Sequence, residues 1–336
     1  MTMKRIIKNY TIKSCMTALA LGCLAGAVSA KELKMSHFSS PTYPLYVEVM
    51  APLAEKVAET TGGDLTIRIY HGGELGADAS KQYERTFEGV ADISLALPGY
   101  TASQFRKSLM IELPGVVPGG EDVTETVWAN VEQLDDEFRR TKLLGFWSNS
   151  PGVLMTADKP IRTLDDIKGM KIRVPSKNVG RVIEAWGGTP VSMPITEVYN
   201  SLSTGVIDGI LVDPSPLDNF KLNEVVNYVT VGMHSTNSPM MLVMNRDSYA
   251  GLSDEHRAAL DALTGLGLSK AGRDTQVKGA EEALKNFTDM GKEIITLSPE
   301  EAARFNAESD ALVDTVVTEL KSNGVDVADY VSALRN

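Results

Sequence analysis

Cysteine is nearly absent from this chain, and its placement is informative. Of 336 residues only two are cysteines, Cys15 and Cys23, and both lie within segment 1–30. The rest of the chain has no thiol for a disulfide, a thiolate nucleophile or a thiolate zinc site. Such a protein must be held together by its hydrophobic core, and the 43% of apolar residues are enough for two domains.

Sequence motifs for catalysis and phosphate binding are also missing. The four histidines share no metal-ligand spacing, and neither H-E-x-x-H nor G-x-S-x-G occurs. The glycine-rich segment 71–76 lacks the Gly-Lys-Ser/Thr of a phosphate-binding loop, so we interpret it as a turn. A Ser-His-Asp triad assembled from distant segments is not excluded by sequence. We expect no metal and no cofactor, and an exported enzyme stays as an alternative function.

Positive charge is scarce. The chain has 33 Lys and Arg against 44 Asp and Glu, a net charge of -11, and segment 1–30 holds four basic groups and no acid. The remainder is therefore more acidic still. An acidic surface argues against nucleic acid or an anionic membrane as partner. It does not exclude an anionic ligand, because a local arginine matters more than the overall field.

Segment 1–30 is typical of a secretory signal peptide. A basic region precedes an apolar run over residues 15–28, and Val28-Ser29-Ala30 fits the cleavage rule, which predicts a mature chain beginning at Lys31. The run is short for a membrane span. We expect a periplasmic protein with no membrane insertion after cleavage. The alternatives are an uncleaved anchor and a lipoprotein attached through Cys23.

Hydrophobic periodicity predicts alternating strands and helices. Residues 33–35 and 65–70 have strand patterns and flank a helix over 44–61, a unit that opens an α/β sheet with parallel strands. The remaining pattern predicts strands and helices in turn: strands over 143–147, 206–212 and 240–245, and helices over 78–87, 124–138, 179–186, 197–204, 253–290 and 300–322. The helix over 253–290 contains four glycines that weaken or bend it.

Residues 163–175 combine a capped turn with a strand that carries one arginine. Thr163 can cap a short helix and Gly169 can end it. The strand 171–174 alternates polar and apolar residues, so Arg173 lies on the face opposite its apolar neighbours. From these residues alone, Arg173 is either a solvated surface residue or a cation aimed into a cleft.

This segment resembles part of a known family. Together with Gly187-Gly188-Thr189-Pro190-Val191, Glu197-Val198-Tyr199, Leu202 and Gly205-Val206-Ile207-Asp208-Gly209, it is similar to the central signature of solute-binding proteins of tripartite ATP-independent periplasmic (TRAP) transporters. The pairing of Gly73-x-Leu75-Gly76 with Gly89-x-x-Asp92-Ile93 is a second matching block. The resemblance covers the chain from Leu33 onward. It implies an α/β fold of two lobes with an interlobe cleft, chain crossings and a long bent bridging helix.

The resemblance also implies a division of the chain and a mechanism. We expect a signal peptide over 1–30, lobe I over 31–150 plus about 239–279, and lobe II over 151–238 plus about 280–336. Hinge closure would enclose a small organic acid and deliver it to the TRAP permease subunits in the membrane. We expect a monomer and no enzymatic activity. A sensor module of the same fold is a further alternative.

Arg173 receives its role from the resemblance, because the family's arginine on this strand grips the ligand carboxylate. Ser176, just beyond this strand, is a further candidate. Ligands in α/β proteins bind outside the carboxyl ends of strands, which adds His37 and Phe38 after the first strand as candidates. Tyr100, in the loop that begins at 98, is another.

Four further candidates come from alignment with sialic-acid-binding relatives. Val153 aligns with a second arginine of those proteins, Leu97 with an acid, Ile195 with an aromatic residue, and Val212 or Asp213 with an asparagine. Apolar residues thus replace several polar ones, which predicts a ligand with one carboxylate and a largely apolar body, such as an aromatic or branched-chain acid. If Asp213 faces inward, a ligand hydroxyl or amine is favoured.

Overall fold

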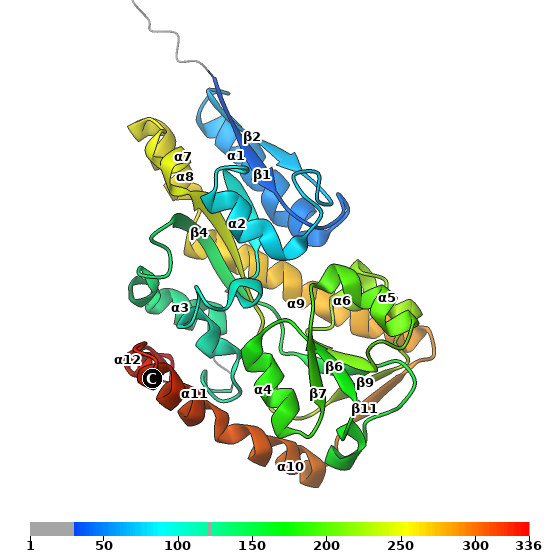
Figure 1. Cartoon of the computed structure of the whole chain (residues 1–336). Coiled ribbons are helices and arrows are strands. Elements are labelled where there is room, and N and C mark those ends of the chain that lie inside the picture. The colour runs from blue at the N-terminus through cyan, green and yellow to red at the C-terminus, as the bar shows by residue number, and fades with distance from the viewer. Residues whose placement is uncertain (1–29, 120–121, 336) are drawn as a thin grey trace, which may run out of the picture.

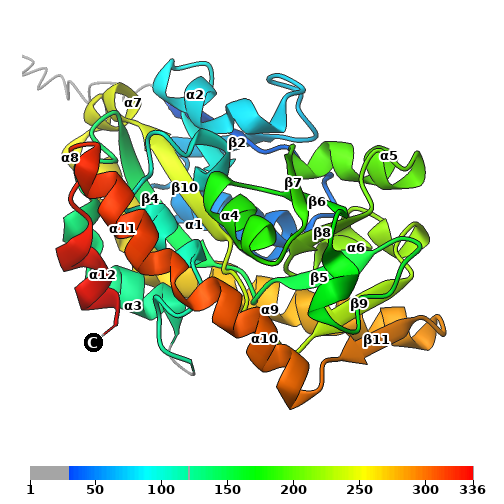
Figure 2. The same cartoon turned by 60° about the horizontal axis from the view of Figure 1, so that its bottom comes forward.

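Two α/β lobes lie side by side in this computed structural model, which describes residues 30–119 and 122–335 (Figures 1 and 2). Each lobe is built on its own sheet. The two-lobed α/β fold expected from the sequence is confirmed. The predicted signal peptide, with Cys15 and Cys23, lies outside the described residues except for Ala30.

The sheet of lobe I has the strand order β2-β1-β3-β10-β4. The strands are β1 (Lys31–Ser36), β2 (Leu65–Tyr70), β3 (Ile93–Ala96), β10 (Pro239–Asn245) and β4 (Thr141–Ser148). β1 pairs in parallel with β2 and β3, as the strand–helix–strand pattern predicts. The connecting helix is a π-helical turn (Tyr46–Met50) continued by α1 (Ala51–Thr60), and its apolar stripe is buried in the core of this lobe.

The sheet of lobe II has the strand order β11-β9-β5-β8-β6-β7. The strands are β5 (Val153–Thr156), β6 (Lys171–Val174), β7 (Thr189–Ser192), β8 (Gly209–Val212), β9 (Tyr228–Val231) and β11 (Glu293–Thr296). β6 lies between β7 and β8 and is parallel to both. Arg173 therefore sits on an internal strand, next to the edge strand β7, close to the carboxyl ends where α/β proteins bind ligands.

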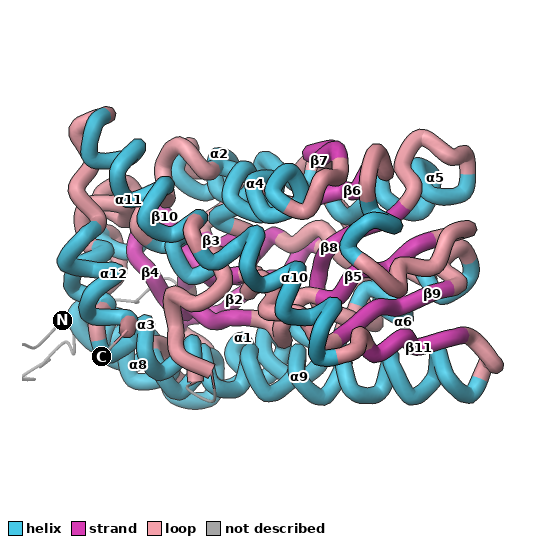
Figure 3. Tube along the Cα trace, turned by 90° about the horizontal axis from the view of Figure 1, so that it is seen from below, coloured by secondary structure: helices cyan, strands magenta, loops and turns pink. Residues whose placement is uncertain are grey.

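Short helices surround the sheets: α2 (Gln82–Phe87), α3 (Val123–Ala129), α4 (Lys177–Ala185), α5 (Val198–Ser203), α6 (Pro216–Asn219) and α7 (Arg246–Ala250). The helix predicted over 253–290 is in fact two, α8 (Asp254–Leu263) and α9 (Leu266–Asp289). The break falls at Thr264 and Gly265, and Gly265 is the N-cap of α9 with φ 78° and ψ -144°, a backbone conformation open to glycine. α9 contacts β4 in lobe I and both α6 and β11 in lobe II, so it bridges the lobes (Figure 3).

The C-terminal helices return from lobe II to lobe I (Figure 2). Phe305 of α10 (Pro299–Asp310) is buried in a core of lobe II. Val316 of α11 (Leu312–Ser322) and Tyr330 of α12 (Ala328–Leu334) belong instead to the core against the sheet of lobe I. The apolar stripes of α11 and α12 thus pack against the first sheet, whereas the division expected from the sequence assigns all residues after about 280 to lobe II.

Two of the chain crossings lie against each other. The segment after β4 runs beside the segment before β10, and the Asn149 backbone N–H donates to the Ser238 carbonyl at 3.0 Å. The Gly152 N–H likewise donates to the Thr236 carbonyl at 2.8 Å. The first crossing was predicted at this position. Paired crossing strands of this kind can act as a hinge between lobes.

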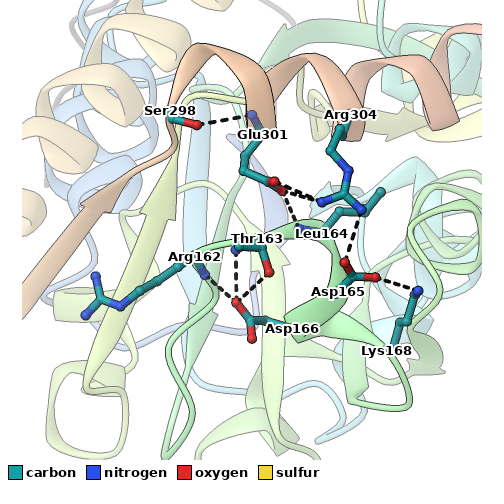
Figure 4. Close-up of polar contacts among 9 residues, drawn as sticks. All are labelled: Arg162, Thr163, Leu164, Asp165, Asp166, Lys168, Ser298, Glu301 and Arg304. Atoms are coloured by element: carbon teal, nitrogen blue, oxygen red, sulfur yellow. Dashed lines mark hydrogen bonds and ion pairs between the residues drawn. The ribbon is translucent and has the colours of Figure 1, made fainter.

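The turn that precedes β6 is held by hydrogen bonds at its N-terminal end (Figure 4). It forms one turn of 3-10 helix, Leu164–Ile167, where a short capped helix was expected. The Thr163 N–H donates to Asp166 Oδ2 at 2.9 Å, and the Leu164 N–H donates to Glu301 Oε2 of α10 at 2.9 Å. These bonds satisfy free N–H groups of the turn and attach the turn to α10.

Candidate ligand-binding site

Arg173 is buried between the lobes, with 1% of its surface exposed. Its Nε donates to the Met193 carbonyl at 2.9 Å, and its Nη2 donates to the hydroxyl of Tyr100 at 3.2 Å. Burial lowers the pKa of the guanidinium, while nearby Tyr100 and Asp213 act in the opposite direction. Arg173 is thus not a solvated strand residue, and its charge lies where an enclosed anion would gain most from it.

A small cavity lies against this guanidinium, at the interface of the lobes. Of the residues predicted from sequence, it is lined by Phe38, Leu97, Tyr100, Arg173, Ile195, Val212 and Asp213. Both Val212 and Asp213, the two alternatives at one aligned position, are among its lining residues. Sequence reasoning missed other lining residues, among them Tyr43, Asn149, Ser215, Phe220, Met240 and Gln276.

Three predicted residues lie beside the cavity without lining it. The His37 ring is fully buried with its Nε2 2.8 Å from His71 Nδ1, and burial together with His71 lowers the pKa of His37 to about 4. Ser176 caps α4, and its hydroxyl donates to Glu112 at 2.6 Å. Val153 is paired with Val212 in the sheet and packs in the core beneath the cavity.

Aromatic rings form much of the cavity wall. Phe38 of lobe I and Phe220 of lobe II lie nearly parallel, with ring centroids 6.5 Å apart and planes inclined by 19°. Tyr43 meets Phe220 edge-on at 6.3 Å. These rings now contact one another. The apolar body of a bound ligand would take the place of these ring–ring contacts and pack against the rings itself.

A buried carboxyl group lies on the same cavity wall as Val212. Asp213 is 1% exposed, and its Oδ1 accepts bonds from the Ser215 N–H at 3.1 Å and the Ser215 hydroxyl at 2.6 Å. Its Oδ2 accepts a bond from Asn149 Nδ2 at 3.0 Å. Burial raises the pKa of Asp213, and these hydrogen bonds oppose the rise. Asn149 and Ser215 share one sequence signal, because each follows the end of a strand.

The lobes are closed upon each other around this cavity. Tyr100 and Glu112 of lobe I bond to Arg173 and Ser176 of lobe II, and Asn178 Nδ2 donates across the same interface to the Leu109 carbonyl at 2.9 Å. The cavity has a volume of about 30 Å³, room for two or three water molecules at roughly 10–15 Å³ each. An organic acid is larger, so the lobes or the aromatic side chains must move apart to admit it.

Comparison with known proteins now decides the family. A sequence model of the bacterial extracellular solute-binding proteins, family 7, matches residues 35–320. The chain belongs to this family. Its members include solute-binding proteins of TRAP transporters, so the chain is a TRAP solute-binding protein and not an enzyme.

Among similar sequences, a solute-binding protein of Chromohalobacter salexigens is 26% identical over 97% of this chain and 99% of its own length. Two solved structures are similar throughout. A marine metagenome TRAP solute-binding protein specific for aromatic acid ligands, in complex with metahydroxyphenylacetate, has a TM-score of 0.85, with 28% identity, 90% of this chain covered and 97% of that one. A TRAP solute-binding protein of Rhodoferax ferrireducens with copurified benzoate has a TM-score of 0.86, with 26% identity and coverages of 91% and 96%.

The described residues contain no helix long and apolar enough to cross a membrane. Within the same residues, no group of three or more His, Cys, Asp or Glu side chains is placed to hold a metal ion.

Proposed function

We propose that this TRAP solute-binding protein captures a monocarboxylate with an aromatic or branched apolar body and delivers it to a membrane permease. The observation that carries the proposal is the buried Arg173 guanidinium at the wall of a cavity lined by Phe38 and Phe220. The guanidinium offers a carboxylate charge-assisted bonds in fixed geometry, and the rings offer an apolar body contact area.

The comparisons support the same ligand class. The two structures at 26% and 28% identity carry benzoate and metahydroxyphenylacetate, which are aromatic monocarboxylates. We extend the proposal to the other residues predicted from sequence: Phe38, Leu97, Tyr100, Ile195, Val212 and Asp213 contact the ligand directly, whereas His37, Val153 and Ser176 support the cavity from behind.

The same proposal covers location and assembly. The basic and apolar pattern of segment 1–30 supports export and cleavage after Ala30, which would release a periplasmic monomer. Lobe I would comprise the first sheet with α11 and α12, and lobe II the second sheet with α10. Ligand would stabilise the closed state, and the permease would recognise that state.

A thermal-shift screen of residues 31–336 tests the function. The panel holds benzoate, phenylacetate, a branched 2-oxo acid, glucuronate, ectoine and an uncharged aromatic alcohol. A ligand at about 100 times its dissociation constant adds about 2.7 kcal/mol to the free energy of unfolding, so the midpoint should rise by several degrees. Stabilisation by aromatic or branched acids supports the proposal. The proposal is overturned if the uncharged alcohol stabilises the protein. It is also overturned if none of the acids does.

A further inference from the structure

Asn149 carries a buried acceptor that the site described so far does not use. The residue follows β4 at the first chain crossing, is 9% exposed and lines the cavity. Its Nδ2 donates to Asp213 Oδ2 at 3.0 Å, whereas its Oδ1 has no hydrogen-bond partner among the described residues. Buried side-chain oxygens of this kind nearly always have a partner in native proteins.

The orientation of the Asn149 amide is set by its neighbour. An ionised Asp213 only accepts hydrogen bonds, so the amide must turn its NH₂ group toward Asp213 and its oxygen away. Ser215 reinforces this arrangement by donating twice to the other carboxylate oxygen. The backbone N–H of Asn149 is bonded to Ser238, which holds the residue in place. The free oxygen is therefore held in a fixed orientation on a residue that lines the cavity.

We propose that the bound acid carries a hydrogen-bond donor, an O–H or N–H group on its body away from the carboxylate, and that Asn149 Oδ1 accepts it. This inference rests on the proposed function, since Arg173 is taken to hold the carboxylate. Asn149 then acts as a specificity residue. A water molecule can satisfy Oδ1 before binding. A ligand that displaces this water without replacing its bond leaves a buried acceptor unpaired and binds less well.

Asp213 strengthens the same preference. Its carboxylate lies on the cavity wall beside Asn149, so a donor that reaches Asn149 also meets a negative charge. A second carboxylate on the ligand would meet that charge unfavourably. The wall around Asn149 and Asp213 thus selects donors and disfavours diacids.

Calorimetric titration of residues 31–336 with matched ligands tests the proposal. The set is benzoate, the ring isomers of hydroxybenzoate, the aminobenzoates as N–H donors, and the methoxybenzoates, which keep the oxygen and lack the donor. We expect at least one hydroxy or amino isomer to bind about tenfold more tightly than benzoate, and its methoxy analogue to bind more weakly than benzoate. Comparison of the hydroxybenzoates with the aminobenzoates shows whether an O–H or an N–H donor is preferred.

Two variants locate the acceptor. Asn149→Leu should lower the preference for the donor-bearing ligand over benzoate several-fold, to the smaller preference that Asp213 supplies, while benzoate still binds. The control Phe220→Leu, on the apolar wall, should weaken all the ligands alike and leave the ratio unchanged. If Asn149→Leu does not fold, the wild-type series decides alone.

The outcomes separate the two proposals. If benzoate binds and no donor-bearing isomer binds more tightly, the donor inference is wrong and the proposed function stands. An undiminished preference in folded Asn149→Leu shows that another group accepts the donor, which overturns the role of Asn149. If no acid binds at all, the proposed function itself fails.

Discussion

The hydroxyl of Tyr100 accepts a hydrogen bond from Arg173 Nη2 at 3.2 Å, and so joins the two lobes at the ligand cavity. The same oxygen accepts a second bond from the Ile195 N–H at 2.9 Å. A tyrosine hydroxyl has two lone pairs and one proton. With both lone pairs engaged, the proton is left to be donated, and a carboxylate beside Arg173 is a suitable acceptor. Tyr100 thus links lobe closure to ligand binding.

Tyr100→Phe should therefore weaken binding of the acid about tenfold, because it removes one donor to the ligand and two bonds between the lobes. Calorimetric titration measures the loss. Tyr199→Phe is the matched control, since its hydroxyl donates to Glu224 on the surface, away from the cavity. Equal affinities of the two variants would contradict the role of Tyr100.

Arg173→Lys should weaken binding of the acid by roughly 10- to 100-fold with the charge retained, because lysine supplies a point charge without the planar fork. The same titration measures this change. Arg162→Lys is the control, because Arg162 makes a solvent-exposed ion pair with Glu293. Retained affinity in Arg173→Lys would rule out the assignment of Arg173 as the carboxylate anchor.

Glu112 should make ligand binding depend on pH. Its carboxyl is buried at the lobe interface against Ser176, with Gly99 and the Pro175 carbonyl beside it, and burial raises its pKa to about 8 from 4.5. Opening of the lobes returns the group to water. Closure therefore favours the protonated form of Glu112. The stabilisation that this carboxyl gives to the closed state is complete below about pH 4.5 and is lost as the pH rises toward 8. Affinity should fall across this range.

Titrations between about pH 5.5 and 8.5, where the ligand stays ionised, measure this effect. Glu112→Gln should flatten the profile. Glu137→Gln is the control: burial raises the pKa of Glu137 to about 7, yet its partner Ser108 belongs to the same lobe. An unchanged slope in Glu112→Gln would exclude Glu112 as the titrating group.

Sequence patterns predicted those features of the protein that are determined by residues adjacent in the chain. The alternation in 171–174 separates Arg173 from its apolar neighbours, and the strand that ends at Val212 is followed by Asp213, which lines the cavity. Asn149 was missed as a lining residue because its place depends on how two crossings pair, which no local pattern encodes. Likewise, the apolar stripe of α11 is visible in the sequence, but whether it covers lobe I or lobe II is decided by packing.

The glycines of α9 show the same distinction and give the last prediction. Sequence analysis treats them alike, as residues that weaken a helix. In the structure a Cβ on Gly272 would lie 2.7 Å from the buried ring of Trp147, whereas a Cβ on Gly267 would meet nothing within 4 Å among the described residues. Gly272 lets the bridging helix approach β4, and Gly267 has no such role.

Gly272→Ala should therefore destabilise the protein by about 1–3 kcal/mol through overpacking, despite the better helix propensity of alanine. Gly267→Ala, the matched control on the same helix, should stabilise it by about 0.4–1 kcal/mol. Urea unfolding of both variants measures the two changes. If both substitutions stabilised the protein, Trp147 would have to move aside to make room for the added methyl group. The close contact between α9 and β4 would then not be required to hold the bridging helix on lobe I.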